Sequence, residues 1–183
     1  MFATIAVTGR FQPFHIDHLD LVVHGLTLAE RVIIGITNPD PRSFVALPEN
    51  DHRHLTGANP FTYYERHEIV CASFEAADIS NDKYTIVPFP IDVPEVWTSY
   101  IPQSVPQLVR CYSVWEEEKV RRFRDAGYET VVIHGNPSTK ISGTDIRVAM
   151  EAGESWQQWI CPGGLKVLRE YSNEDLAARV SRK

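Results

Sequence analysis

The feature that most constrains the fold is an alternation of short β-branched runs with longer stretches of helical periodicity. The runs Ala3–Thr8 and Arg31–Thr37 flank an amphipathic stretch, Ile16–Glu30, whose apolar residues recur at helical spacing. Further strands are expected at Tyr84–Phe89, Leu108–Tyr112 and Glu129–His134. Strands that alternate with helices form parallel sheets with helices on both faces. We therefore expect an α/β fold built on a parallel five-stranded sheet.

Signals for helix ends define the remaining helices. Thr62 precedes Glu65 by three residues, which predicts a capping box at the start of a helix over Thr62–Ala77. Gly127 is expected to end a helix over Glu116–Ala126. Three more helical segments are predicted at Gly143–Ala152, Trp156–Tyr171 and Asn173–Val180, so that about residues 141–183 form a helical C-terminal part. A chain of 183 residues suits one domain over residues 1–183.

Composition narrows the possible partners. A net charge of −6 argues against a surface that coats nucleic acid. The N-terminus lacks a secretory signal, and no apolar run is long enough to span a bilayer. The three cysteines lie far apart in the sequence and are interpreted as free thiols in a reducing compartment. We expect a cytoplasmic protein without nucleic-acid or membrane partners.

A histidine pair follows the first predicted strand, within the segment Gly9–His18. His15 and His18 stand at the start of a predicted helix, where unpaired N–H groups and the helix dipole attract phosphate. Arg10 can bind phosphate through two hydrogen bonds, and Gly9 lets the backbone approach a ligand. Taken alone, the pair is more simply explained as a helix cap or as two solvent-exposed side chains.

A second motif near the C-terminus makes a phosphate site the better interpretation. In residues 141–147 (ISGTDIR), Ser142 and Thr144 stand at a predicted helix start, again a place that binds anions. Arg147 lies one turn inside the helix and could reach back to the phosphates, and Lys140 is a further candidate. The alternative is an ordinary helix cap with a solvated arginine. The two motifs in this order on an α/β pattern favour a nucleotide-binding enzyme.

These motifs resemble those of the HxGH nucleotidylyltransferase superfamily. Further matches, at residues 59–62, 65–66, 88–90, 96–97, 100, 149–150 and 152–156, resemble the archaeal-type nicotinamide-nucleotide (NMN) adenylyltransferases. The similarity covers nearly the whole chain and implies a Rossmann-like nucleotidylyltransferase fold. It also implies transfer of NMP from an NTP to a small phosphate-bearing acceptor, with Mg²⁺ bridging the NTP phosphates. Because archaeal-type relatives assemble into oligomers, a homo-oligomer is expected.

The resemblance also implies roles for individual residues. His15, His18 and Arg147 would be catalytic, the histidines by binding the NTP phosphates and stabilising the transition state. Nucleotide-binding roles are implied for Gly9, Arg10, Phe11, Gln12, Lys140, Ser142 and Thr144. Acceptor-binding roles are implied for Asn59, Trp97, Tyr100 and Tyr112, with the Trp97 indole stacked on the acceptor ring; a place in the hydrophobic core is the alternative for Trp97. No residue is expected to form a metal site by itself.

Three places depart from the family pattern. Asp17 replaces the usual glycine between the two histidines, and it could cap the helix or bind Mg²⁺. The family's TGN-like triplet is replaced by Cys111-Tyr112-Ser113, in a region that shapes the nucleotide pocket. The stretch 38–59 looks longer than its counterpart and adds basic residues and histidines, either as a solvated loop or as a lid over an unusual acceptor.

The sequence therefore predicts a nucleotidylyltransferase, and ATP with NMN or nicotinate mononucleotide is the first expectation. A CTP-dependent cytidylyltransferase acting on a phosphonate or alditol phosphate would use the same motifs and is the main alternative. A module that binds nucleotide without catalysis is a further alternative, suggested by Asp17 near the phosphates.

Overall fold

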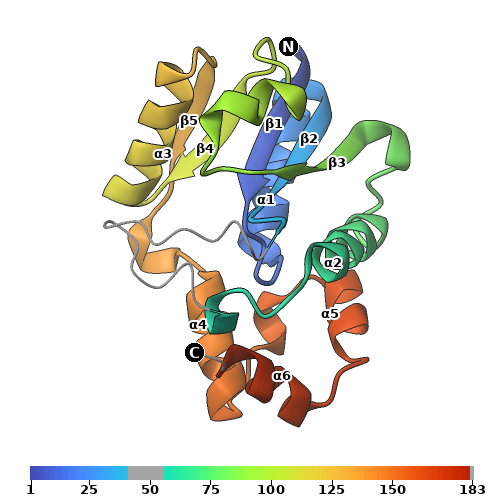
Figure 1. The fold of residues 1–183 in the computed structure, drawn as a ribbon. Helices are drawn as coiled ribbons and strands as arrows, with labels where there is room; N and C mark the ends of the chain where they lie inside the picture. Colours follow the sequence, from blue (N-terminus) through green and yellow to red (C-terminus); the bar gives the residue numbers. More distant parts are fainter. Residues whose placement is uncertain (41–55, 182–183) are drawn as a thin grey trace. The chain divides into compact units, whose positions relative to one another are not determined.

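The β-branched runs of the sequence form one sheet. The computed structural model describes residues 1–40 and 56–181. Its strands are β1 (Phe2–Gly9), β2 (Ala29–Thr37), β3 (Tyr84–Phe89), β4 (Gln107–Cys111) and β5 (Thr130–His134). They pair in the order β3-β2-β1-β4-β5, and every pair is parallel (Figure 1). The strand order reverses between β1 and β4, and open parallel sheets bind ligands at the carboxyl ends of such strands.

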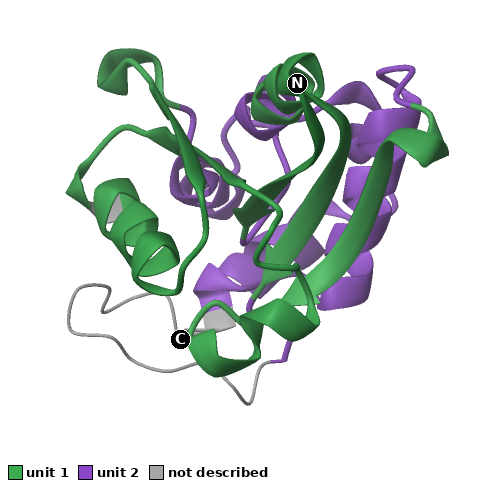
Figure 2. Ribbon diagram, turned by 90° about the horizontal axis from the view of Figure 1, so that it is seen from above, with its two compact units in different colours: residues 1–9, 20–37, 80–140 green, residues 10–19, 38–79, 141–183 purple. Residues whose placement is uncertain are grey.

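Contacts divide the chain into two compact units, which Figure 2 shows in green and purple. Unit 1 contains residues 1–9, 20–37 and 80–140, and therefore the whole sheet. Unit 2 contains residues 10–19, 38–79 and 141–183. The expectation of a single domain over residues 1–183 stays a prediction.

Helices cover both faces of the sheet in unit 1. On one face, Gly25 of α1 (Ile16–Leu28) lies against Ile5 and Leu108, where a Cβ would meet side-chain carbons at 3.3–3.4 Å. This contact brings the helix close to the strands. On the other face, Phe123 of α3 (Val114–Asp125) packs in a buried cluster with Ala6 and other strand residues. The expected α/β arrangement with helices on both faces is confirmed.

Unit 2 is helical apart from its connecting segments. It contains α2 (Tyr63–Glu75), α4 (Gly143–Ala152), α5 (Pro162–Leu168) and α6 (Asn173–Val180). The helices α2 and α5 lie side by side (Figure 1). Gly163 allows this contact, because a Cβ there would lie 1.8 Å from the Ala72 carbonyl oxygen. Glu65 of α2 accepts hydrogen bonds from Tyr171 and Arg179, which fixes α6 against the start of α2.

Most predicted boundaries agree with the structure to within two residues. The capping box between Thr62 and Glu65 is present, and Gly127 follows α3 with a φ of 83°. The predicted continuous helical segment Trp156–Tyr171 is wrong. A short 3-10 turn, η6 (Gln157–Trp159), precedes α5, and the helix starts only at Pro162. Proline lacks an N–H donor and is favoured in the first turn of a helix, so it starts a new helix here.

Candidate active site

The segment that follows β1 is a tight turn built around Phe11. Phe11 has a φ of 51°, a left-handed conformation that is costly for a bulky residue. Its side chain is 1% exposed and packs edge-on against Phe14 and His18, with ring centroids 5.3 and 4.9 Å away. Phe11 is therefore a packing residue of the turn. The sequence predicted a nucleotide contact at this position, and the side chain is buried instead.

The two predicted catalytic histidines lie together. The rings of His15 and His18 stack with centroids 3.6 Å apart. The backbone N–H of His15 donates to Nδ1 of His18 over 3.3 Å, so Nδ1 acts as an acceptor. In a neutral imidazole the proton is then on Nε2, which can donate to a phosphate oxygen.

His15 is buried and uncharged at neutral pH. Its side chain is 2% exposed, and Nδ1 has no hydrogen-bond partner among the described residues. Burial lowers the pKa of His15 from 6.5 to about 4, although the carboxylates of Asp17 and Asp145 raise it. An unsatisfied polar atom in a buried place is costly, and a ligand that accepts a hydrogen bond from it would remove the cost. The expected phosphate is such a ligand.

The second motif forms the start of α4 in the same unit. Ser142 caps the helix by accepting from the N–H of Asp145 over 3.1 Å. The guanidinium of Arg147 donates to the Gln12 carbonyl over 2.7 Å and to Oγ1 of Thr144 over 3.1 Å. Gly143 permits this approach, because a Cβ there would lie 3.0 Å from the Gln12 carbonyl oxygen. The structure thus brings the two sequence motifs together.

Arg147 has a structural task in addition to the predicted one. Its side chain is buried, and burial lowers its pKa to about 10, so it keeps its positive charge at neutral pH. Two of its N–H groups are used in the bonds to Gln12 and Thr144, whereas a guanidinium has five. The predicted contact between Arg147 and the NTP phosphates stays a prediction.

The remaining predicted residues of unit 2 hold the turn. The Gln12 amide donates to the Phe61 carbonyl over 2.8 Å and accepts from the Phe61 N–H over 3.0 Å. Gln12 is therefore not directed at a phosphate as expected, because its amide is paired with the backbone. Arg10 is half-buried and donates to the Ala58 carbonyl over 3.3 Å, and the half-buried Asn59 follows directly. The possible lid falls mostly on residues 41–55, which lie outside the described residues.

The predicted residues of unit 1 gather where β4 and β5 end. Nζ of Lys140 donates to Glu116 over 2.7 Å and lies 5.0 Å from the centroid of the Tyr112 ring. Burial alone would raise the pKa of Glu116, but hydrogen bonds from Lys140 and Ser113 outweigh burial and lower it. The Tyr112 ring lies directly on Gly135, where a Cβ would be 2.1 Å from Cε1 of the ring. Gly9 ends the neighbouring strand β1.

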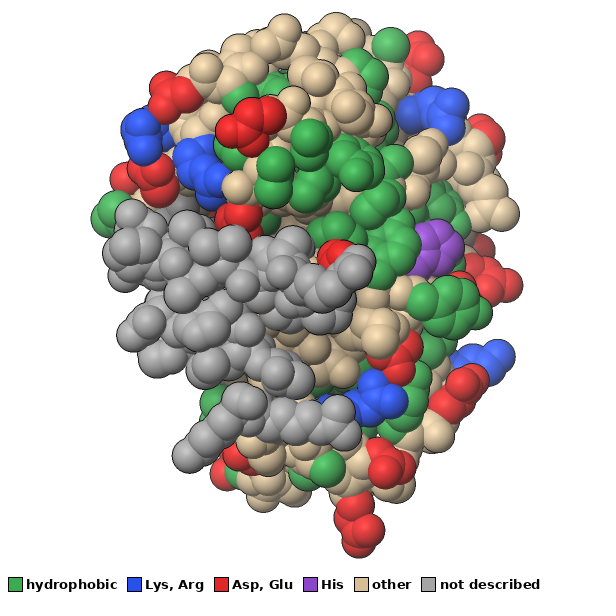
Figure 3. All heavy atoms as spheres, viewed as in Figure 1, with side chains coloured by type: hydrophobic (Ala, Val, Ile, Leu, Met, Phe, Trp, Pro, Cys, Tyr) green, Lys and Arg blue, Asp and Glu red, His purple; other side chains and the backbone are tan. Residues whose placement is uncertain are grey.

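Trp97 and Tyr100 differ in accessibility. Trp97 lies in η4 (Pro94–Ser99), and Tyr100 follows it. Hydrophobic side chains gather near η4 on the face seen in Figure 3. Tyr100 is 37% exposed and can meet a ligand. The Trp97 indole is 0% exposed, packs against Phe89 and Phe123, and donates to the Pro90 carbonyl. The structure therefore places Trp97 in the core, and stacking on an acceptor ring would require the indole to leave it.

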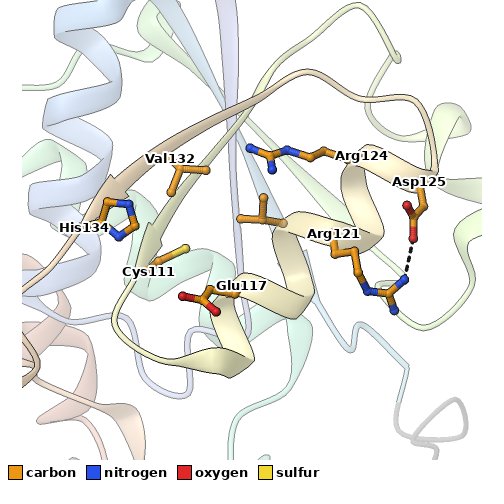
Figure 4. A pocket seen from close by; sticks show the side chains of 8 residues that line it. Cys111, Glu117, Arg121, Arg124, Asp125, Val132 and His134 are labelled. Carbon is orange, nitrogen blue, oxygen red and sulfur yellow. Dashed lines mark hydrogen bonds and ion pairs between the residues drawn. The ribbon is translucent and has the colours of Figure 1, made fainter.

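A cavity of about 390 Å³ in unit 1 was not predicted from the sequence. It lies between α3 and β5, and Figure 4 shows its lining. Val120 and Val132 form an apolar part, and the paired side chains of Arg121 and Asp125 lie at its outer end. None of the predicted catalytic or binding residues lines this cavity, but Cys111 of the Cys111-Tyr112-Ser113 triplet does.

The described residues offer little to bind a metal alone. Among residues 1–40 and 56–181, no group of three or more His, Cys, Asp and Glu side chains could hold an ion. Asp17 and Asp145 are the carboxylates close enough to His15 to act on its pKa. The donor set fits a cation that arrives with the oxygen ligands of a triphosphate, since Mg²⁺ is usually bound by one or two carboxylates plus substrate phosphates. Within the same residues, no helix is long and apolar enough to cross a membrane.

Comparison with solved structures identifies the fold. The bifunctional NMN adenylyltransferase/ADP-ribose pyrophosphatase of Francisella tularensis superimposes with a TM-score of 0.69 at 18% identity, over 97% of this chain. The chain spans about half of that protein, 52% of its length. A nicotinate-nucleotide adenylyltransferase from Vibrio parahaemolyticus superimposes with a TM-score of 0.56 over 92% of this chain. The chain thus has the Rossmann-like fold of nucleotidylyltransferases.

Comparison of sequences identifies the family. No protein-family model matches the chain. The phosphonoformate cytidylyltransferase of Streptomyces viridochromogenes is 32% identical over 91% of this chain and 91% of its own length. The nicotinamide-nucleotide adenylyltransferase of Thermoplasma volcanium is 31% identical over 88% of this chain and 83% of its own length. With the histidine pair, the capped α4 and these relatives together, the chain belongs to the nucleotidylyltransferase family that contains both of these enzymes.

Proposed function

We propose that this enzyme transfers CMP from CTP to a small phosphonate or phosphate and releases pyrophosphate. An oxygen of the acceptor anion forms a bond to the α-phosphorus while the bond from that phosphorus to the bridging oxygen of pyrophosphate breaks. The acceptor is already ionised at neutral pH, so the protein need not remove a proton from it. It contributes positioning and charge stabilisation.

Unit 2 would hold the triphosphate. The Nε2–H of His18 and the buried imidazole of His15 are hydrogen-bond donors for the charge that develops on the phosphates. Arg10 and Arg147 would add positive charge, and Ser142 would cap the helix start that faces the anion. Asp17 and Asp145 would help to hold a Mg²⁺ ion, which would supply positive charge against the phosphates when bound. The single observation that carries the proposal is the stacked His15–His18 pair with its unsatisfied Nδ1 atom.

Three observations favour a cytidylyltransferase acting on a small acceptor. The phosphonoformate cytidylyltransferase matches this chain over 91% of both sequences, so the two proteins have nearly the same extent. In addition, the Trp97 indole is buried in the hydrophobic core, so it is not available to stack on a nicotinamide ring as expected. The Tyr112 ring on Gly135 fills space where β4 and β5 end, and this would suit a pyrimidine better than a purine.

ATP with NMN or nicotinate mononucleotide is the second candidate. Several archaeal nicotinamide-nucleotide adenylyltransferases are 28–31% identical over 88–90% of this chain, which supports it. The expectations of a cytoplasmic location and of a homo-oligomer stay predictions under either candidate.

Pyrophosphate release distinguishes the two candidates. CTP, ATP, GTP and UTP would each be combined with phosphonoformate, other small phosphonates, alditol phosphates, NMN and nicotinate mononucleotide, with Mg²⁺ or Mn²⁺. Release with CTP and a small phosphonate or phosphate is the expected result. Release with ATP and a pyridine nucleotide would replace it by the second candidate. Nucleotide binding without release from any combination would instead support a non-catalytic module.

A further inference from the structure

One buried arginine of unit 2 has no part in the mechanism above. Arg66 belongs to α2 and is 1% exposed, and its guanidinium donates to backbone carbonyls of the same unit. Burial lowers its pKa to about 10, which still leaves it protonated at neutral pH. Buried charges are costly unless they are hydrogen-bonded, so the bonds of Arg66 show what the charge is used for.

Among the described residues, the guanidinium donates to three backbone carbonyls from three parts of the unit. Nη1 donates to Arg10 over 2.7 Å, Nη2 to Asn38 over 2.8 Å, and Nε to Thr62 over 3.2 Å. Asn38 has a φ of 52° and follows β2 in the chain, and Thr62 is the N-cap of α2. A planar fork of donors can satisfy three fixed acceptors at once, which the ammonium of a lysine does not reproduce.

The Arg10 carbonyl stands next to the left-handed residue of the phosphate turn. Phe11 follows Arg10, and the carbonyl of Gln12, the residue after Phe11, accepts from Arg147. The unfavourable backbone of Phe11 is thus held by one buried arginine on each side. A strained backbone conformation persists only where several surrounding contacts hold it in place.

The Phe11 side chain contacts His18, so the conformation of the turn affects the position of the histidines. Its ring meets His18 edge-on with centroids 4.9 Å apart, and His18 stacks on His15 at 3.6 Å. A rotation of the Arg10–Phe11 peptide would move the Phe11 ring and with it the face on which His18 rests. The orientation of the Nε2–H of His18 therefore depends on the position of the Arg10 carbonyl.

We infer that Arg66 is a positioning residue for nucleotidyl transfer, which fixes the His15–His18 pair by holding the Arg10 carbonyl beside Phe11. This inference rests on the proposed function for its kinetic consequence, although its structural consequence can be measured without any substrate. Arg66 does not touch the reacting atoms and acts through the turn.

The test compares Arg66→Lys and Arg66→Ala with the wild type. We expect Arg66→Lys to lower kcat about tenfold or more, because small displacements of catalytic groups have large effects on rate. The KM values for NTP and acceptor should change less than kcat does. Added guanidinium ion should restore part of the activity of Arg66→Ala. Nitrogen and ring-proton NMR signals of His15 and His18 should shift in Arg66→Lys without substrate.

Arg179→Gln is the matched control. Arg179 lies in the same unit and binds Glu65 and the Pro60 carbonyl, so its loss weakens the attachment of α6 without touching the phosphate turn. It should lower Tm while kcat and the histidine signals stay as in the wild type. The inference would be overturned if the histidine signals of Arg66→Lys stayed as in the wild type. It would also be overturned if Arg179→Gln lost as much kcat as Arg66→Lys while the two variants had the same Tm. If the wild type released no pyrophosphate, the proposed function would fail, and the NMR signals would still decide on Arg66.

Discussion

The phosphate turn in unit 2 and the ends of β4 and β5 in unit 1 are built in opposite ways. In the turn, buried side chains bond mainly to backbone atoms, as Arg66, Arg147 and Gln12 do. At the strand ends, side chains bond to other side chains, as Lys140 and Glu116 do beside the Tyr112 ring. A backbone acceptor is present whatever residue occupies the position, whereas a side-chain partner disappears with a single substitution.

The difference indicates where the chemistry and the choice of substrate are encoded. The turn carries the motif that this chain shares with its family, and its buried bonds leave little freedom for change. The strand ends carry Cys111-Tyr112-Ser113, where the sequence departs from the archaeal-type pattern. We infer that the first region fixes nucleotidyl transfer, and that the second adjusts the choice of base.

The largest expected effect is on the turn itself. His18→Ala removes a donor to the developing phosphate charge and should lower kcat by about 10²–10³-fold, with a much smaller rise in KM. Steady-state pyrophosphate release measures both constants. If kcat were unchanged, His18 would have no catalytic role, and the contrast between the two regions would lose its basis.

The next effect concerns the pH dependence of stability. Burial holds the pKa of His15 at about 4, below the 6.5 of an unfolded chain, so the unfolded state binds more protons between these values. The stability that this provides is complete above pH 6.5 and is lost as the pH falls towards 4. Between about pH 7 and pH 4, the wild type should lose about 3 kcal/mol more unfolding free energy than His15→Gln.

Urea unfolding at several pH values measures this difference. His134→Gln is the matched control, because it removes an exposed histidine at the end of β5. Parallel pH profiles for the wild type and His15→Gln would show that the buried neutral imidazole does not contribute in this way.

The smallest effect is expected at the strand ends. Tyr112→Asn removes the ring that lies on Gly135 and opens space there. We expect it to shift the ratio of kcat/KM for CTP over ATP by about tenfold towards ATP, the size of effect that pocket shape usually has. Tyr112→Phe keeps the ring and should keep the ratio. If the ratio shifted in both variants, or in neither, the Tyr112 ring would not determine the choice between CTP and ATP.

The fold could be predicted from the sequence because its signals are local. β-Branched runs, the Thr62–Glu65 capping box and Gly127 each act within a few residues. The break before Pro162 was missed because the periodicity continues through it, although the proline itself was the available signal. Strand order depends on pairing between distant segments, and periodicity carries no information about it.

The candidate site was predictable only in part for the same reason. The histidine pair and the cap by Ser142 follow from neighbouring residues. Arg66 lies in a segment that resembles the family, but nothing in its sequence surroundings points to a carbonyl 56 positions away. The burial of Trp97 likewise depends on Phe89, Phe123 and Tyr128, which come from separate elements. The predicted roles of Lys140, Tyr100 and Asn59 in binding stay predictions.

The pairing of β1 with β4 also sets an order for assembly. β1 lies beside β2, which follows it after a single helix, but its other neighbour is β4, and Ala6 pairs with Gln107. During synthesis the chain leaves the ribosome from its N-terminus, so β1, β2 and β3 can meet before β4 exists. The edge of β1 that faces β4 carries unpaired backbone N–H and C=O groups until about 100 further residues have been made.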